Sequence, residues 1–286
     1  MNAENVPSRS DAENNSVTGG GRSNRPLLME QMTVKEVTEA LQRTQTVILP
    51  VGCVEQHGWH LPLNTDIFNA YEVAKEVSCR TGCLVAPVMP YSYSGGELPG
   101  TINISPQTAA AVIIDICNSL ARQGFRHIIV LLGHGGSENL QGVRAGLDIA
   151  LRSGIIPERA TVALVPFYEL SPTIMACLKE KDYHAGKFET SLMLYWHPEM
   201  VRDERPTDTP EIRAMLRGGQ DAYQKALKKV AHPLVMARIR QDERIKIGVF
   251  GDPDQADAAL GKQMCDEVCC GLVELIRQME AAPDPA

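Results

Sequence analysis

The stretch "TVILPVGCVEQHGWHLPLNTD", residues 46–66, joins a short apolar segment directly to a cluster of polar side chains. Residues 46–52 are rich in β-branched side chains, which is typical of a strand buried on both faces of a parallel sheet. The polar part contains Glu55, His57, His60 and Asp66 within twelve positions. All four are possible metal ligands, so the stretch predicts that chemistry begins where a strand ends.

Three similar apolar segments follow at 83–90, 127–133 and 161–167, and helical segments separate them at 67–81, 106–123 and 138–153. Ser105 is the expected N-cap of the second of these helices, with Pro106 at its first position. An earlier helix begins at Thr33, where Glu36 completes a capping-box spacing. This alternation predicts an α/β fold in which helices cover both sides of a parallel sheet.

Composition divides the chain into three parts. Residues 1–26 are rich in Ser, Asn and Gly and predict a disordered leader. Residues 27–280 form one predicted domain, in which a polar, proline-containing stretch at 203–211 precedes another helix. Residues 254–280 predict a last amphipathic helix, and 281–286 a frayed tail.

Charge and hydropathy exclude some partners. The chain has 28 basic and 35 acidic residues, a net charge of −7, which argues against a nucleic-acid partner. It contains no apolar run near the ~20 residues of a membrane span and no apolar stretch of a secretion signal. We therefore expect a cytoplasmic protein with no membrane partner. Its eight cysteines form no CxxC pair and predict buried or half-buried free thiols; a thiolate zinc site is the alternative.

The polar segments gather at one edge of the predicted sheet. Ligands of an open α/β sheet bind beyond the carboxyl ends of its strands, and His134 directly follows the segment 127–133. Gly133, Gly135 and Gly136 flank His134 and allow backbone to approach a metal or substrate closely. The segment "HAGKFETS", residues 184–191, adds His184 and Glu189.

These side chains suit Zn²⁺, Mn²⁺ or Fe²⁺, because they combine imidazole with carboxylate. Glu55 and His57 leave the same face of an extended segment, and Asp66 is placed where its carboxylate could bridge two ions. The number of ligands exceeds what one catalytic zinc takes, so we expect a pair of metals. Such a pair can generate hydroxide and polarise a carbonyl oxygen, which predicts hydrolysis of an amide-like or ester-like carbon.

Five segments, in order, resemble motifs of the creatininase (creatinine amidohydrolase) family. They are "PVGCVEQHGWHLPLNTD" (50–66), "LPGTINIS" (98–105), "GHGGSEN" (133–139), "HAGKFETSLML" (184–194) and "GVFGDPDQADAALGK" (248–262). The resemblance covers about residues 30–280. It implies a three-layer α/β/α fold with a mostly parallel central sheet, a dinuclear metal site and assembly as a homohexamer.

The resemblance also implies roles for individual residues. Glu55, His57, Asp66, His134 and Glu189 match metal-ligand positions, with Asp66 as the bridge, and His184 matches an acid/base position. Where creatininase has Tyr-Glu after the turn histidine, this chain has Gly135-Gly136, so Glu138 is a candidate to act instead. Tyr168 and Glu180 correspond to an aromatic pair over the substrate of creatininase. Further candidate substrate-binding residues are Gly100, Thr101, Gly135 and Gly136.

Three functions remain open at this point. The first is hydrolysis of an amide-like C–N bond in a small polar substrate such as a cyclic amide or formamide, with His184 relaying a proton. The second keeps the two Zn²⁺ or Mn²⁺ ions but opens a cyclic ketone or lactone of a sugar or inositol. The third is a non-catalytic, metal-stabilised binder of a small molecule.

Overall fold

The structure is a computed structural model that describes residues 25–283. The predicted leader at 1–26 lies outside the described residues except for its last two, and half of the predicted tail at 281–286 lies outside them, so these two predictions stay predictions. The helix at the end of the described chain continues to Ala281.

The central sheet has five parallel strands in the order β1-β3-β2-β4-β5. All four predicted strands are present, and β1 is an additional one. The strands are β1 Leu27–Leu28, β2 Thr46–Val51, β3 Leu84–Val85, β4 His127–Leu132 and β5 Thr161–Pro166. The strand predicted at 83–90 is much shorter, because Pro87 has no N–H to donate to a neighbouring strand. The register pairs Thr46 with His127 and Val51 with Leu132, so β2 and β4 end level at the carboxyl edge.

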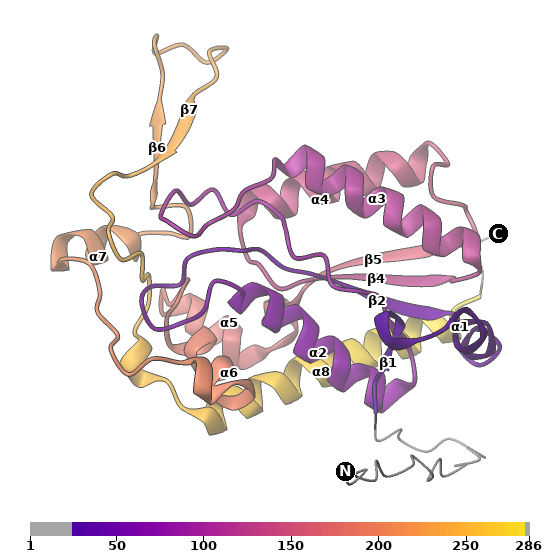
Figure 1. Ribbon diagram of the computed structural model, residues 1–286. Helices are drawn as coiled ribbons and strands as arrows, with labels where there is room; N and C mark the ends of the chain where they lie inside the picture. The colour runs from indigo at the N-terminus through magenta and orange to yellow at the C-terminus, as the bar shows by residue number, and fades with distance from the viewer. Residues whose placement is uncertain (1–24, 284–286) are drawn as a thin grey trace, which may run out of the picture.

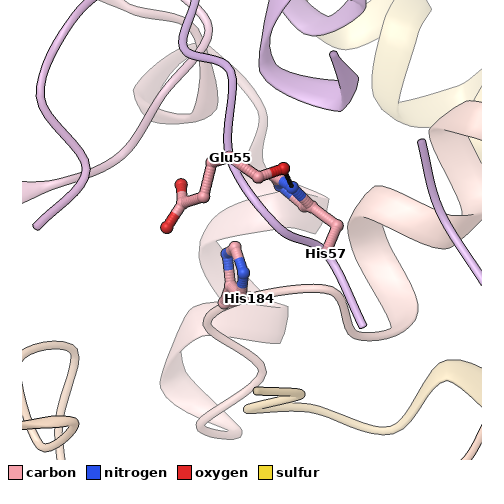
Figure 2. A group of neighbouring side chains, drawn as sticks. All are labelled: Glu55, His57 and His184. Atoms are coloured by element: carbon pink, nitrogen blue, oxygen red, sulfur yellow. Dashed lines mark hydrogen bonds between the residues drawn. The ribbon is translucent and has the colours of Figure 1, made fainter. Parts of the chain in front are cut away.

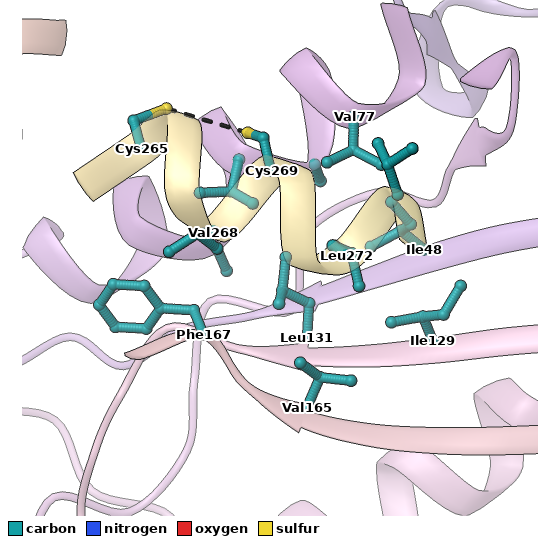
Figure 3. Packing of buried hydrophobic residues seen from close by; sticks show 14 of the residues in the cluster. Ile48, Val77, Ile129, Leu131, Val165, Phe167, Cys265, Val268, Cys269 and Leu272 are labelled. Carbon is teal, nitrogen blue, oxygen red and sulfur yellow. Dashed lines mark hydrogen bonds between the residues drawn. The ribbon is translucent and has the colours of Figure 1, made fainter. Parts of the chain in front are cut away.

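Helices cover both faces of this sheet, and the predicted three-layer α/β/α architecture is confirmed (Figure 1). One face carries α1 Val34–Leu41, α3 Pro106–Gln123 and α4 Ser137–Arg152. The other carries α2 Thr65–Thr81, α5 Pro172–Lys179, α6 Lys187–Trp196 and α8 Ala258–Ala281. On that second face, Val268 and Leu272 of α8 lie over Leu131 of the sheet (Figure 3). Burying such apolar side chains stabilises the fold by about 1.5–3 kcal/mol each.

Helix ends follow their capping residues. The Oγ of Ser105 accepts a hydrogen bond from the Thr108 amide at 3.2 Å, and Pro106 opens α3 as predicted. Thr33 and Glu36 form both bonds of the predicted capping box. Helix α8 begins four residues later than predicted, because the carboxylate of Asp257 caps it by accepting from the Ala259 and Leu260 amides at 2.7 and 3.1 Å.

A short helix and a hairpin stand between α6 and α8. Helix α7, Pro210–Leu216, is the helix predicted after the polar stretch 203–211. The antiparallel strands β6, Gln224–Leu227, and β7, Arg238–Gln241, were not predicted. They form a hairpin that projects away from the layered body (Figure 1). Short 3-10 turns complete the described chain at Met29–Gln31, Phe167–Leu170, Pro198–Met200 and Pro253–Gln255.

All eight cysteines are free, as predicted, and only Cys270 is exposed. The Sγ atoms of Cys265 and Cys269 lie 4.0 Å apart on α8 (Figure 3). No cysteine belongs to a possible metal-binding group within residues 25–283, so the alternative of a thiolate site finds no support there. Among the described helices, none combines the length and the apolar character needed to cross a membrane.

Candidate metal centre

The carboxyl edge of the sheet brings together all five predicted metal ligands from four separate segments. Glu55 and His57 follow β2, Asp66 lies in the first turn of α2, His134 follows β4, and Glu189 lies in the first turn of α6. They form two groups whose ligand atoms lie within 4.8 Å of one another. Asp66 belongs to both groups.

The first group consists of Glu55, Asp66 and His134. The Nδ1 atom of His134 lies 3.1 Å from Oε2 of Glu55 and 3.1 Å from Oδ2 of Asp66. These spacings are close to those between two ligand atoms that each lie about 2.0–2.2 Å from one zinc ion. All three side chains are buried.

The second group consists of His57, Asp66 and Glu189. The Nε2 atom of His57 lies 3.5 Å from Oδ1 of Asp66 and 3.5 Å from Oε1 of Glu189. The other ring nitrogen, Nδ1, lies 3.1 Å from the backbone oxygen of Glu55 and donates its proton there. That bond leaves Nε2 available, and Nε2 is fully buried with no hydrogen-bond partner among the described residues. A buried imidazole nitrogen aimed between two carboxylates fits a metal ion.

Close backbone packing holds Asp66 between the ends of β2 and β4. A Cβ atom added to Gly133 would lie 2.0 Å from the backbone oxygen of Asp66, and one added to Gly52 would lie 2.6 Å from the Cα of Ile67. The start of α2 can therefore approach the strand ends only because both positions are glycine. The position of Asp66 thus depends on two glycines, Gly52 and Gly133.

Asp182 organises the loop that carries His184 and Glu189. Its buried carboxylate accepts hydrogen bonds from the amides of Lys187, Phe188 and Asp252 at 2.9, 3.0 and 3.0 Å. At the tip of the same loop, the Ala185 amide donates to Oε2 of Glu189 at 2.6 Å, which leaves Oε1 toward His57. The sequence did not mark Asp182, because it lies five residues before the helix whose first amides it binds.

His184 faces the first two ligands of the opening stretch (Figure 2). Its ring centroid lies 4.3 Å from that of His57, and it forms a third close group with Glu55 and His57. Its Nε2 lies 2.8 Å from the backbone oxygen of Gln56. Donation of the Nε2 proton to that oxygen leaves Nδ1 as the basic nitrogen.

The charges of the five groups depend on one another. Burial alone would lower the pKa of His57 and His134, but the carboxylates of Glu189, Glu55 and Asp66 raise both pKa values well above the usual range. Burial would raise the pKa of Asp66, but the two histidines lower it. The carboxylates therefore favour the protonated form of both imidazoles, and a metal ion would compete with those protons for the same nitrogens.

A cavity opens in front of the ligands. Glu55, His134, His184 and Glu189 line it, together with Gly135, Gly136 and Tyr168, three of the predicted substrate-binding residues. Five further aromatic and three glutamine side chains line it as well, and its third carboxylate is Asp221; no Lys or Arg is among the described lining residues.

Several predicted residues lie outside this cavity. Gly100 and Thr101 do not line it, although Oγ1 of Thr101 accepts a hydrogen bond from the Gln56 amide at 3.1 Å and so braces the ligand segment. Glu138, at the start of α4, accepts a hydrogen bond from the side chain of Gln224 and belongs to neither ligand group. Glu180 points to solvent, and Tyr183 lines the cavity in its place. The roles of Gly100, Thr101 and Glu138 stay predictions.

His60, the remaining possible ligand of the opening stretch, does not join the metal-binding groups. It is fully buried, and its Nε2 lies 3.0 Å from Oγ1 of Thr190 in α6. Burial, with the nearby Arg205 guanidinium, lowers the pKa of His60 to about 4. His60 is therefore a neutral packing residue that connects the ligand segment to α6.

Sequence comparison finds related hydrolases. The family model "Creatininase: Creatinine amidohydrolase" matches residues 30–276. Creatinine amidohydrolase of Pseudomonas putida is 33% identical over 198 residues, which cover 63% of this chain and 75% of that protein. The 3-dehydro-scyllo-inosose hydrolase of Thermotoga maritima is 29% identical over 272 residues, covering 89% and 84%. The mycofactocin precursor peptide peptidase of Mycolicibacterium smegmatis is 28% identical over 248 residues, covering 82% and 85%.

Solved structures show the same fold. A structure described as "Creatininase Mn" superimposes with a TM-score of 0.71 at 26% identity and covers 90% of this chain and 100% of its own. A mutant creatininase of the "Zn-Zn type" gives a TM-score of 0.70 at 26% identity, covering 90% and 99%.

Proposed function

The chain belongs to the creatininase family and is a hydrolase, and from that premise we propose that it hydrolyses an amide-like C–N bond with two divalent metal ions. The observation that carries the proposal is the position of Asp66, whose two carboxylate oxygens face two different histidines at 3.1 and 3.5 Å. One carboxylate shared by two ligand groups can hold two metal ions close together. A non-catalytic scaffold would not need both groups beside an open cavity.

The five proposed ligands would be shared between two metal ions. Glu55 and His134 would hold one ion, His57 and Glu189 the other, and Asp66 both. Zn²⁺ or Mn²⁺ fits this mixture of imidazole and carboxylate, and creatininase structures of both kinds support that choice. When bound, such ions lower the pKa of water and polarise a carbonyl oxygen.

His184 is the proposed acid/base residue. It lies beside Glu55 and His57 but outside the two groups that share Asp66, so it is free to move a proton. With Nε2 held by the Gln56 backbone oxygen, Nδ1 can take a proton and deliver it to the leaving nitrogen. Asp182 positions this histidine by fixing the loop around it.

The cavity suits a small substrate that is polar but carries no negative charge away from the scissile bond. Its aromatic and glutamine side chains can pack against a ring and bind polar groups. A carboxylate or a phosphate on the substrate would meet the carboxylate of Asp221 but no cationic side chain among the described lining residues. We also propose a homo-oligomer, and a hexamer on the basis of the family resemblance.

Opening of a cyclic ketone or lactone is the second candidate function. It is favoured by the similarity, over 89% of this chain, to a hydrolase of 3-dehydro-scyllo-inosose. The same ligands and the same His184 would serve it, because attack on a carbonyl is common to both reactions. The leaving atom distinguishes the candidates: an amide releases a nitrogen that takes a proton, a lactone releases an oxygen that takes a proton, and a ring ketone releases a carbon that leaves as an enolate and is then protonated.

A metal-controlled substrate screen tests the proposal. The full chain is stripped with a chelator, reloaded with Zn²⁺ or Mn²⁺, and assayed with cyclic amides, formamides, short peptides, sugar lactones and inososes. Metal-dependent turnover of an amide, absent in Asp66→Asn, is the expected result. Turnover of ketones or lactones alone would select the second candidate, and amide turnover without any metal would overturn the metal-dependent mechanism.

A further inference from the structure

The hairpin formed by β6 and β7 has no partner among the described residues at its far end. Its two strands enclose the tip segment 228–237, and together they form an arm of residues 224–241 (Figure 1). A two-stranded hairpin is at best marginally stable alone in water. This arm therefore needs either a strong anchor at its base or a surface that covers it.

The base of the arm is well anchored. The side chain of Gln224 binds Glu138 and the phenol of Tyr223, and Tyr223 donates to the Ser94 backbone oxygen at 2.9 Å. Tyr223 and Gln241, at the two ends of the arm, both line the cavity. The arm is thus continuous with the wall of the candidate active site.

The outer part of the arm exposes apolar side chains that the base does not cover. Leu234 and Met236 in the tip are 85% and 87% exposed. Leu227, Val230 and Ile239 are 54%, 56% and 47% exposed. Five large apolar side chains within thirteen residues are more than a short solvated hairpin needs, and such concentrations mark interaction surfaces.

The arm is also strongly basic. It contains Lys225, Lys228, Lys229, Arg238 and Arg240 and no acidic residue, whereas the other 268 residues carry 23 basic and 35 acidic residues, a net charge of −12. The strand register places Lys225 opposite Arg240 and Leu227 opposite Arg238, so three cations share one face. Only Lys225 forms an ion pair within the described chain, at 2.9 Å with Asp242. Like charges directly opposite each other destabilise a hairpin unless an acidic surface covers them.

We propose that residues 224–241 dock onto the acidic body of a second copy of this chain. The apolar tip supplies buried contact area, and the basic face is matched by the excess negative charge of the body, which the same chain provides in every copy. The acidic body disfavours the alternative partners, because it would repel an anionic membrane or a nucleic acid brought close by the arm. Since the arm begins and ends at the cavity, docking would also fix the cavity wall in place.

Sedimentation of the full-length protein tests this proposal. The wild type should sediment as an oligomer whose dissociation constant rises when salt is increased from about 0.05 to about 0.5 M. The tip variant Leu234→Ser/Met236→Ser should raise the dissociation constant at least about tenfold. Val34→Ser, at a side chain 86% exposed on α1, is the matched control and should leave it unchanged. Arg238→Glu/Arg240→Glu should weaken association likewise, with Lys35→Glu on α1 as its control.

Each variant is also assayed for bound metal and for the family hydrolase activity. Metal content should stay at the wild-type level. The mass measured by sedimentation does not depend on catalysis, so a failure of the catalytic proposal would leave this test valid. A wild-type chain that sediments as a monomer would overturn the proposal, as would tip variants that keep the wild-type mass. Binding of a monomeric wild type to phosphatidylserine vesicles or to duplex DNA would assign the arm to that partner instead.

Discussion

Asp66 is the residue on which both ligand groups depend. Asp66→Asn keeps the size of the side chain but removes the charge and one acceptor oxygen. We expect this variant to lose most of both ions and to reduce kcat/KM more than about 100-fold. Metal analysis with turnover is the measurement, and Asp115→Asn, an exposed loss of charge on α3, is the control. Two ions retained at wild-type occupancy would remove Asp66 from the bridging role.

His184 and His134 should respond differently to the same substitution. His184→Ala removes a proton carrier beside the ligands, so it should keep its metals and lose about 10²–10⁴-fold in kcat. The defect should shrink for substrates whose leaving group departs without a proton. His134→Ala removes a ligand, so it should lose metal affinity and be partly rescued by excess Zn²⁺ or Mn²⁺. The paired measurement is metal stoichiometry with kcat, and the opposite pattern would require the two histidines to exchange roles.

Three of the five proposed ligands, Glu55, His57 and His134, could be located from sequence because they directly follow strands. Asp66 and Glu189 lie in the first turns of helices, and the motif resemblance indicated their role. The register of β2 with β4 then places Glu55 and His134 together without further information. His60 shows the limit of this inference: its residue type and position suit a ligand, but its ring turns toward Thr190 in a helix 130 residues away in sequence. Only the tertiary packing distinguishes it from His57.

Helices α5 and α8 are joined by one carboxylate, that of Glu267. It accepts hydrogen bonds from Oγ of Ser171 at 2.6 Å and from Oγ1 and the amide of Thr173 at 2.7 and 3.0 Å. Burial alone would raise the pKa of Glu267, but these donors and the side-chain amide of Gln263, which donates at 2.9 Å, lower it to about 2. A carboxyl with a lowered pKa stabilises the fold above its ordinary pKa near 4.5, and that stabilisation is lost as the pH falls toward 2.

Glu267→Gln should therefore destabilise the protein by about 1 kcal/mol at pH 7, a value limited by the solvent around this carboxylate. The difference from wild type should shrink as the pH falls from about 5 to about 3. Urea unfolding of the metal-free protein is the measurement, because it excludes metal loss in acid. Glu274→Gln, exposed on the same helix, is the control, and a difference that stayed constant with pH would contradict the prediction.

Elements with local signals were predicted well, and the arm was not. Helix α3 matches its prediction at both ends, because Ser105, Pro106 and the left-handed Gly124 are all local signals. Residues 224–241 lack the alternation of a half-buried strand and the Asn-Gly of a tight turn. If a second copy covers the arm, the apolar residues of the arm pack against a surface of that other copy. A pattern of that kind cannot be interpreted from one chain alone.

The metal pair should stabilise the molecule as a whole. Three buried carboxylates and two buried imidazoles meet at the edge of the sheet, and ions that bind only the folded chain shift the equilibrium toward it. At about 100 times the dissociation constant the gain is about 2.7 kcal/mol, or about 5–10 °C in Tm for a domain of this size. Thermal unfolding with and without chelator is the measurement, and Asp66→Asn should show almost no shift. A wild-type Tm that did not change on metal removal would contradict the proposed occupancy.

The order of the ligands along the chain has a consequence for synthesis. Glu55, Asp66 and His134 are complete once the ribosome has added residue 134, whereas the group that contains Glu189 needs 55 residues more. Because Asp66 serves both groups, a nascent chain that has folded β2, α2 and β4 already presents one set of three ligands. The two halves of the centre would therefore mature in sequence, with the first ion acquired during translation and the second only when α6 has been made.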